Sequence, residues 1–320
     1  MDIVIPDDYP PMYATLDQPD LVRLRPYGSV QLHTTRAADR RELFSRIDSA
    51  EVVINVRAYT ALDEESFSNA PRLRLISILG TGTDNIDLAA ATRRGIAVTN
   101  TPGVGAASVA ELTLGLMLAL ARAIPVSDAR LRQGIWQHVE GPELAGKTLG
   151  LLGLGTIGGY VARLGQGVGT RVIGWSFARD FARAERLGLE LVEPDDVFRR
   201  SDVVSLHLRN TPEVRGLVGA RQLALMKPTA YLINTARGAL VDSSALAEAL
   251  RSRRIAGAAL DVHTEEPLAP ERNPFRDLDN VILTPHIGAV TREANARSRA
   301  MPVDNIIAFL EGRPQNVVKP

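Results

Sequence analysis

The sequence predicts an α/β fold arranged as two domains, and three observations lead to that prediction. The chain has 320 residues, whereas one domain commonly has about 100–200. Short apolar runs alternate with helical patterns along its length, which is typical of parallel sheets covered by helices. One of these runs leads straight into a glycine-rich turn over residues 153–158, and a helical pattern follows.

In the first third of the chain, the predicted strands are short runs rich in Val, Ile and Leu. They cover residues 3–5, 52–56, 73–79 and 96–100. The next segment, residues 106–123, is mostly apolar but includes Glu111 and Arg122. A membrane span needs about 20 predominantly apolar residues, and a charged residue inside it is costly. We therefore expect a buried or interface helix here and no membrane partner.

From residue 148 onward, predicted strands and helices alternate more regularly. The strands cover residues 148–155, 171–175, 202–208, 230–236, 257–262 and 280–286. Helices are predicted between them, for example over 155–168 and 243–251. A last helix is predicted over 291–311, where Pro302 should kink or interrupt it because proline lacks a backbone N–H.

Charge and composition exclude several classes of protein. The 37 Lys and Arg residues balance 37 Asp and Glu residues, so the formal net charge is zero. A nucleic-acid-binding domain would show a basic excess, and we expect no such partner. Without cysteine the chain has no disulfides, thiolate metal sites or cysteine nucleophile. Its N-terminal residues are acidic, unlike those of a signal peptide, so we expect a cytoplasmic protein.

The turn from Gly153 to Gly158 matches G-x-G-x-x-G. A chain with 26 glycines can produce this pattern by chance, but here a strand precedes it and a helix and second strand follow, as in a dinucleotide-binding fold. Gly153 would permit the tight turn, Gly155 the approach of a pyrophosphate, and Gly158 close packing of the helix on the sheet. Thr156 and Ile157 open that helix, whose free N–H groups attract phosphate. The alternative is a turn of structural use only.

The end of the second strand departs from the usual pattern for NAD. That pattern places an Asp or Glu about 20 residues past the loop to hold the ribose hydroxyls. This chain has Ser176 eighteen residues after Gly158, with Arg179 nearby. Without a carboxylate to repel a 2′-phosphate, NADP(H) is favoured over NAD(H). The alternative is that Arg179 is a solvated loop residue and Asp180 holds the ribose.

Three polar motifs follow predicted strands near the end of this unit. They contain Arg237, Glu266 and His286. The carboxyl ends of parallel strands form the ligand crevice of an open α/β sheet, so these side chains could converge on a small anionic substrate. Histidine can hold or release a proton near neutrality, a Glu on its second nitrogen fixes the tautomer, and Arg grips a carboxylate with paired hydrogen bonds. Each residue alone has a structural explanation.

With these motifs in place, the chain resembles the D-isomer-specific 2-hydroxyacid dehydrogenases over nearly its whole length. The motifs occur in the order and spacing typical of that family. They are Val56-Arg57-Ala58, residues 80–87 from Gly80 to Asp87, Ser108-Val109-Ala110-Glu111, the glycine loop, Thr235-Ala236-Arg237-Gly238, Asp261 with Glu266-Pro267, and Thr284-Pro285-His286-Ile287-Gly288.

The resemblance implies a role for each matching residue. Arg237 would bind the carboxylate and keto oxygen of the substrate, His286 would be the acid/base, and Glu266 would pair with His286. Thr81 and Gly82 match the turn that receives the carboxylate. Arg57 matches a residue that contacts the substrate phosphate in phosphoglycerate dehydrogenases, or else it forms a surface ion pair. The cofactor-binding residues would be Gly153, Gly155, Thr156, Ile157, Gly158, Ser176, Arg179, Thr235, Ala236, Asp261 (on the nicotinamide carboxamide) and Gly288.

The resemblance also implies the overall organisation. Two Rossmann-like or flavodoxin-like domains are expected, with the NAD(P)-binding domain (100–288) inserted into a substrate domain (1–99 and 289–320). The helix after Ser108 and the arm that follows it would form a homodimer interface. The other four histidines are taken as structural, because none has metal-ligand spacing, and no metal is expected.

The expected activity is hydride transfer between a nicotinamide cofactor and a small D-2-hydroxy or 2-oxo acid. Glyoxylate or hydroxypyruvate reduction, commonly NADPH-linked in the family, would fit Ser176. Two alternatives remain. One is a phosphoglycerate dehydrogenase lacking a C-terminal regulatory domain, since the chain stops at Pro320. The other is a nucleotide-sensing, corepressor-like binding protein with the same fold.

Overall fold

The computed structural model describes residues 1–57 and 60–318, so Ala58 of the first family motif lies outside the described residues. The chain forms two compact units, Met1–Val104 with Thr291–Pro320, and Gly105–Val290. The predicted boundaries, after residues 99 and 288, come slightly too early. Residues 100–104 stay with the first unit because they are hydrogen-bonded to it: the Asn305 side chain donates to the Asn100 carbonyl, and the Arg297 side chain to the Val104 carbonyl.

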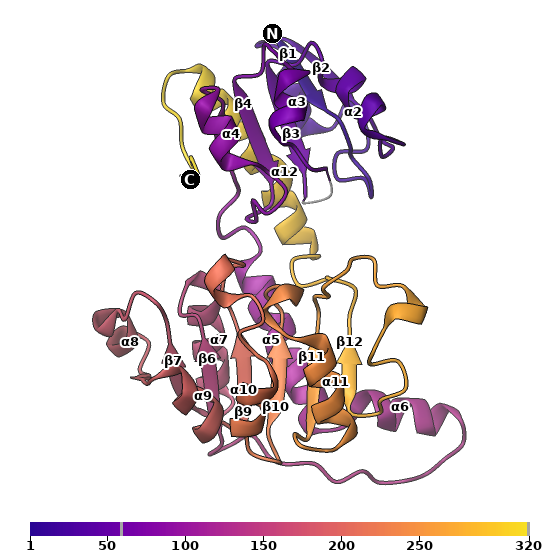
Figure 1. Ribbon diagram of the computed structural model, residues 1–320, viewed down its shortest axis with the longest axis vertical. Coiled ribbons are helices and arrows are strands. Elements are labelled where there is room, and N and C mark those ends of the chain that lie inside the picture. The colour runs from indigo at the N-terminus through magenta and orange to yellow at the C-terminus, as the bar shows by residue number, and fades with distance from the viewer. Residues whose placement is uncertain (58–59, 319–320) are drawn as a thin grey trace. The chain divides into compact units, whose positions relative to one another are not determined.

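The first unit is a five-stranded sheet in the order β2-β1-β3-β4-β5, with helices on both faces (Figure 1). Helices α2, α3 and α4 pack on one face, and α1 and α12 on the other. Its elements are β1 (Asp2–Ile5), α1 (Pro19–Val22), β2 (Ser29–Leu32), α2 (Arg40–Ile47), β3 (Val52–Val56), α3 (Glu64–Ser68), β4 (Leu75–Leu79), α4 (Leu88–Arg93), β5 (Ala97–Thr99) and α12 (Arg292–Leu310).

The second unit is a seven-stranded sheet in the order β12-β11-β10-β9-β6-β7-β8. Helices α9, α10 and α11 cover one face, and α5, α7 and α8 the other. Its helices are α5 (Ala106–Ala121), α6 (Ile124–Arg132), α7 (Thr156–Gly167), α8 (Phe181–Arg186), α9 (Pro194–Arg200), α10 (Ala220–Leu225) and α11 (Ser243–Arg251), with short 3-10 turns η1 (Pro212–Val214), η2 (Gly238–Leu240) and η3 (Pro270–Arg272). Its strands are β6 (Thr148–Leu152), β7 (Arg171–Trp175), β8 (Glu190–Leu191), β9 (Val203–Leu206), β10 (Tyr231–Asn234), β11 (Gly257–Leu260) and β12 (Val281–Leu283).

The strand pairs within both sheets are parallel, which confirms the predicted α/β class. Central strands such as β3, β4 and β6 are buried along their whole length, because helices cover both of their faces. That is why they appear in the sequence as continuous apolar runs. Several helices begin at a side chain that accepts a backbone N–H bond; these caps are Asp39, Asp63, Asp87, Asp180, Asp242 and Thr291.

Two strands were missing from the sequence prediction, and one proline behaves differently. Strands β2 and β8 lie at sheet edges and are partly exposed, so neither forms an apolar run. Helix α12 continues through Pro302 as one element, so the predicted interruption is wrong. Pro302 is buried, and its carbonyl accepts a hydrogen bond from the Ser77 hydroxyl on β4. Pro302 is thus packed inside the first unit rather than at a break in the helix.

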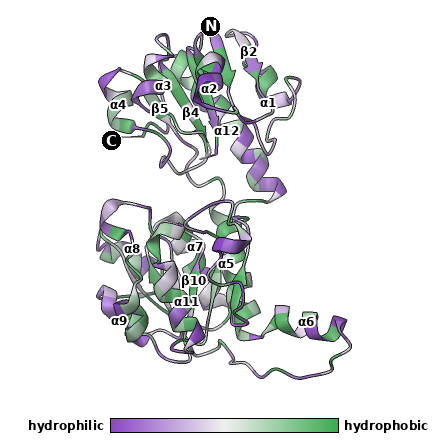
Figure 2. Cartoon of the chain, turned by 45° about the vertical axis from the view of Figure 1, so that its right-hand side comes forward, coloured by the Kyte–Doolittle hydropathy of each residue, from purple (hydrophilic) through white to green (hydrophobic). Residues whose placement is uncertain are grey.

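Helices α5 and α6 follow each other with a sharp bend. Among the described residues, no single helix is both long and apolar enough to cross a bilayer; α5 and α6 reach that length and composition only as a pair, bent by 62°. Helix α6 and the loop after it extend away from the rest of their unit (Figures 1 and 2).

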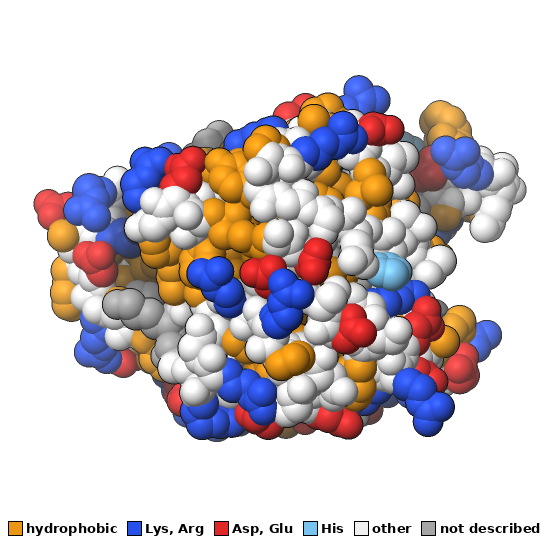
Figure 3. Space-filling view, turned by 90° about the horizontal axis from the view of Figure 1, so that it is seen from above, with side chains coloured by type: hydrophobic (Ala, Val, Ile, Leu, Met, Phe, Trp, Pro, Cys, Tyr) orange, Lys and Arg blue, Asp and Glu red, His pale blue; other side chains and the backbone are white. Residues whose placement is uncertain are grey.

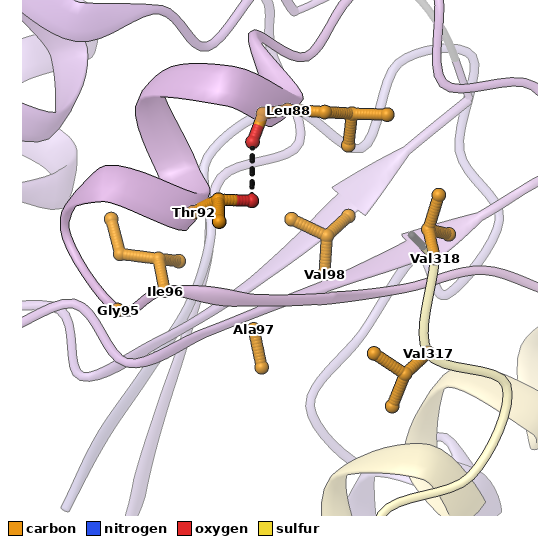
Figure 4. A pocket seen from close by; sticks show the side chains of 8 residues that line it. All are labelled: Leu88, Thr92, Gly95, Ile96, Ala97, Val98, Val317 and Val318. Atoms are coloured by element: carbon orange, nitrogen blue, oxygen red, sulfur yellow. Dashed lines mark hydrogen bonds between the residues drawn. The ribbon is translucent and has the colours of Figure 1, made fainter. Parts of the chain in front are cut away.

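The surface charge and the cavity beside β5 give little further indication of a ligand. On the face shown in Figure 3, basic and acidic side chains are intermingled, in keeping with the zero net charge. A cavity of about 240 Å³ lies beside β5 in the first unit, where Val98 and the C-terminal residues Val317 and Val318 line it (Figure 4). Its lining is almost wholly aliphatic, so it offers no groups for catalysis.

Candidate active site

The glycine loop lies at the point where the strand order of the second sheet reverses. From β6 the chain goes to β7 on one side and later returns to β9 on the other. In such sheets, ligands bind at the carboxyl ends of the strands flanking this point. Gly153 has φ +104°, and a Cβ there would lie 2.4 Å from the His207 carbonyl oxygen. A Cβ at Gly158 would lie 2.1 Å from the Gly153 oxygen, so both positions require glycine.

The loop leaves room for a ligand at its centre. A Cβ at Gly155 would meet no described atom within 4 Å. Helix α7 begins immediately afterwards, and no described side chain caps its N-terminus. The first turn of α7, which includes Thr156 and Ile157, thus has no side-chain cap among the described residues, and an uncapped helix N-terminus is the standard arrangement for binding phosphate. This cradle fits the pyrophosphate of a dinucleotide.

The side chains around Ser176 at the end of β7 are already engaged. Arg179 donates two hydrogen bonds to Glu193, at 2.6 and 2.8 Å. Asp180 caps α8 by accepting from the Arg183 backbone N–H. The Arg183 side chain donates to the Gly155 carbonyl at 2.9 Å, so it lies against the glycine loop. Sequence reasoning missed Arg183 and Glu193, since a charged residue in a helix pattern carries no signal of its partner.

Glu266 and His286 meet directly. The distance from His286 Nδ1 to Glu266 Oε2 is 2.7 Å, and the His263 backbone N–H donates to the other carboxylate oxygen at 3.0 Å. Burial tends to raise the pKa of Glu266, but the hydrogen bonds from His286 and His263 outweigh it and leave that pKa below its usual value. Glu266 is therefore ionised at neutral pH, and the stability gained from this site disappears only as the pH falls below the ordinary carboxyl range.

Asp261 holds the loop that carries His286. Its buried carboxylate accepts hydrogen bonds from the Thr284 hydroxyl and the Ile287 N–H on one oxygen, and from the Gly288 N–H on the other. His286 lies in this loop at φ +55°, a backbone conformation uncommon outside glycine. Each carboxylate oxygen has two lone pairs, so Oδ2 retains one acceptor position. The predicted contact with a carboxamide is compatible with this second, structural role.

Arg237 follows β10 in a turn that Asn234 closes. The Asn234 side chain accepts from the Ala236 N–H and donates to the Arg237 carbonyl. The Thr235 hydroxyl is buried against the Thr113 hydroxyl, 2.9 Å away. Because β10, β11 and β12 are neighbours in the sheet, Arg237, Glu266 and His286 all emerge at the same edge. The structure thus brings the predicted catalytic residues together at the carboxyl ends of neighbouring strands in the second unit.

The predicted substrate residues lie at the carboxyl ends of two neighbouring strands of the first unit. Arg57 follows β3 at φ +62°, and its guanidinium lies 3.2 Å from the Met12 sulfur. Thr81 and Gly82 follow the neighbouring strand β4. The Thr81 hydroxyl donates to the Thr101 carbonyl, which fixes the turn and leaves its outer side exposed.

His207, expected to be structural, lies beside the glycine loop. Its carbonyl is the group that a Cβ on Gly153 would strike, and its ring nitrogen Nε2 is 2.9 Å from the Ser205 hydroxyl. Burial lowers the pKa of His207 to about 3, so the ring is neutral at working pH. Among the described residues, no group of three or more His, Asp or Glu side chains is arranged to hold a metal ion.

Comparisons with known proteins agree with this geometry. Residues 114–288 match the family model described as the D-isomer specific 2-hydroxyacid dehydrogenase, NAD binding domain. The glyoxylate reductase of Aeropyrum pernix is 45% identical over 267 residues, covering 80% of this chain and 79% of that protein. The D-3-phosphoglycerate dehydrogenase of Methanocaldococcus jannaschii is 42% identical over 92% of this chain, which spans only 56% of that longer protein.

Solved structures resemble the whole chain as well. The D-lactate dehydrogenase from Aquifex aeolicus, complexed with NAD and lactic acid, has a TM-score of 0.87 and 29% identity, with 100% of each chain covered. The similarity therefore extends across both units and includes a protein with a dinucleotide and a 2-hydroxy acid bound.

Proposed function

This chain belongs to the D-isomer specific 2-hydroxyacid dehydrogenase family, and from that premise we propose that it reduces small 2-oxo acids such as glyoxylate or hydroxypyruvate, with NADPH preferred over NADH. As a family member, it is an NAD(P)-dependent oxidoreductase that transfers a hydride between a nicotinamide cofactor and a 2-hydroxy or 2-oxo acid. The observation that carries the proposal is the 2.7 Å contact between His286 and Glu266, at the same sheet edge as Arg237.

His286 is assigned the proton transfer. The nicotinamide, when bound, supplies the hydride. With Nδ1 on the Glu266 carboxylate, the protonated ring of His286 keeps Nε2–H as the donor for the oxygen of the substrate. The negative charge of Glu266 stabilises the imidazolium before transfer and fixes the neutral ring with its proton on Nδ1 afterwards.

Arg237 is assigned the substrate carboxylate. A guanidinium can bind a carboxylate through two parallel hydrogen bonds and remains charged at every working pH. It also places positive charge where the carbonyl oxygen becomes negative. By the family resemblance, Thr81 and Gly82 are assigned to carboxylate binding and Arg57 to the remainder of the substrate.

The preference for NADPH rests on Ser176. A carboxylate at this position would hold the ribose hydroxyls of NAD and repel a 2′-phosphate, whereas a serine hydroxyl can hydrogen-bond either. Asp180 is an unsuitable substitute, because its side chain caps α8. Arg179 and Arg183 place two guanidinium groups near this strand end.

A panel of 2-oxo acids assayed with each cofactor tests the proposal. We expect kcat/KM for glyoxylate or hydroxypyruvate to be higher with NADPH than with NADH. We also expect it to exceed kcat/KM for 3-phosphohydroxypyruvate with either cofactor. A clear preference for the phosphorylated acid would instead assign Arg57 to its phosphate. Cofactor binding without turnover on any 2-oxo acid would contradict the reductase assignment, and a strong NADH preference would contradict the argument from Ser176.

We also propose that the protein is a homodimer joined through α6 and the loop after it. Helix α6, all of whose residues are described, has no buried residue, and large apolar side chains are exposed at Ile124, Leu131, Ile135 and Trp136, the last of them 81% exposed. Apolar side chains gathered in this way mark an association surface. Sedimentation should give a dimer for the wild type and a monomer for Leu131→Glu, and a wild-type monomer would refute the proposal.

A further inference from the structure

An exposed ion pair at the ribose end of the cofactor crevice bears on cofactor choice. Arg179 and Glu193 are 60% and 62% exposed and are joined by two hydrogen bonds. The Arg179 backbone N–H also donates to the Ser176 carbonyl at 3.2 Å. Arg179 therefore belongs to the same turn as Ser176, the residue assigned to the ribose. Its guanidinium, however, is already hydrogen-bonded to the Glu193 carboxylate.

The charges near Ser176 balance. Arg179 is opposed by Glu193, while Arg183 has a neutral partner in the Gly155 carbonyl and Asp180 contributes a second carboxylate as the cap of α8. These four side chains sum to zero. A 2′-phosphate, with a charge of about −1.5 to −2, would therefore find both guanidinium groups engaged, and one of them must change partner to bind it.

Arg179 is the arginine that can change partner at little cost. An exposed ion pair contributes little to stability, and a phosphate dianion is a stronger acceptor for a guanidinium than a single carboxylate. Glu193 directly precedes Pro194, the first residue of α9, so its backbone is held at the start of that helix within reach of Arg179.

We propose that Glu193 is an internal competitor of the 2′-phosphate for Arg179 and thereby sets the ratio of NADPH to NADH use. With NADH, Arg179 stays on Glu193; with NADPH, it turns to the phosphate. The inference rests on the proposed function, because it requires the cofactor ribose at Ser176. Glu193 would contact neither cofactor and would influence cofactor specificity only through Arg179.

The test is a double-mutant cycle on this pair. Glu193→Gln should raise the affinity for NADPH roughly two- to fivefold, the range expected for releasing an exposed pair, and should alter the affinity for NADH much less. Arg179→Gln should lower NADPH affinity about tenfold or more. In the Arg179→Gln background, adding Glu193→Gln should have no further effect. Salt near 1 M should diminish the gain, because it screens exposed charges.

The chain offers a matched control. Glu190 on β8 forms the same two-bond contact with Arg200, at 2.9 and 2.6 Å, but its strand position pairs with Ile173 rather than with the end of β7. Glu190→Gln should leave the cofactor ratio unchanged. Titrating NADPH and NADH by fluorescence, without substrate, keeps this test separate from the reductase assignment. An unchanged ratio in Glu193→Gln, or a gain that persists without Arg179, would overturn the proposal.

Discussion

Replacing His286 by asparagine is expected to lower kcat for 2-oxo acid reduction by roughly 10²–10⁴-fold, the contribution typical of a positioned acid/base. An amide can keep the hydrogen bond to Glu266 but has no proton to deliver. Since His286 lies in the loop after β12 and the phosphate cradle lies after β6, the dissociation constant for NADPH should change little. Initial rates, together with fluorescence titration of NADPH, measure both quantities.

Glu266→Gln is the companion variant for this prediction. It keeps a polar partner for the ring nitrogen that contacts Glu266 in the wild type but removes the negative charge beside the ring. The loss of kcat should be smaller than in His286→Asn, because the ring can still donate a proton from Nε2. If His286→Asn retained near-normal turnover, proton transfer would have to be assigned to another group.

Arg237→Ala is the second large effect that we expect. Losing two charge-assisted hydrogen bonds to the substrate carboxylate costs about 3–5 kcal/mol, or roughly 10²–10⁴-fold in kcat/KM. Cofactor affinity should be largely retained. The turn itself should survive, because Asn234 closes it through backbone atoms of Ala236 and Arg237. Steady-state kinetics over a wide range of substrate concentrations would measure the loss.

Arg237→Lys distinguishes charge from geometry. Lysine keeps the positive charge but lacks the planar fork of the guanidinium, so it should recover only part of the activity. The unfolding temperature of both variants checks that the fold is intact. Wild-type kcat/KM in Arg237→Ala would show that the carboxylate is bound elsewhere.

Much of the fold could be predicted because its central strands are buried on both faces. Strands such as β4 and β6 therefore appear as continuous apolar runs, and the glycine loop marks the turn into α7. The edge strand β8 has no such signature, because it has only two residues, one of them the exposed Glu190. Pro302 was expected to break α12 because local chemistry disfavours it, but buried packing on β4 decides the outcome.

By itself, the sequence determined the α/β class, the glycine loop and the placement of Arg237, Glu266 and His286 after successive strands. These features depend on local periodicity and on which residues follow each strand. The family resemblance also implied that Glu266 pairs with His286, and the structure places the two side chains in contact. Only the tertiary structure decided the partner of Arg179, which is Glu193, 14 residues further along the chain, because strand order and register bring the ends of neighbouring strands together. A charged residue's partner depends on that three-dimensional register, which no local pattern of residues encodes.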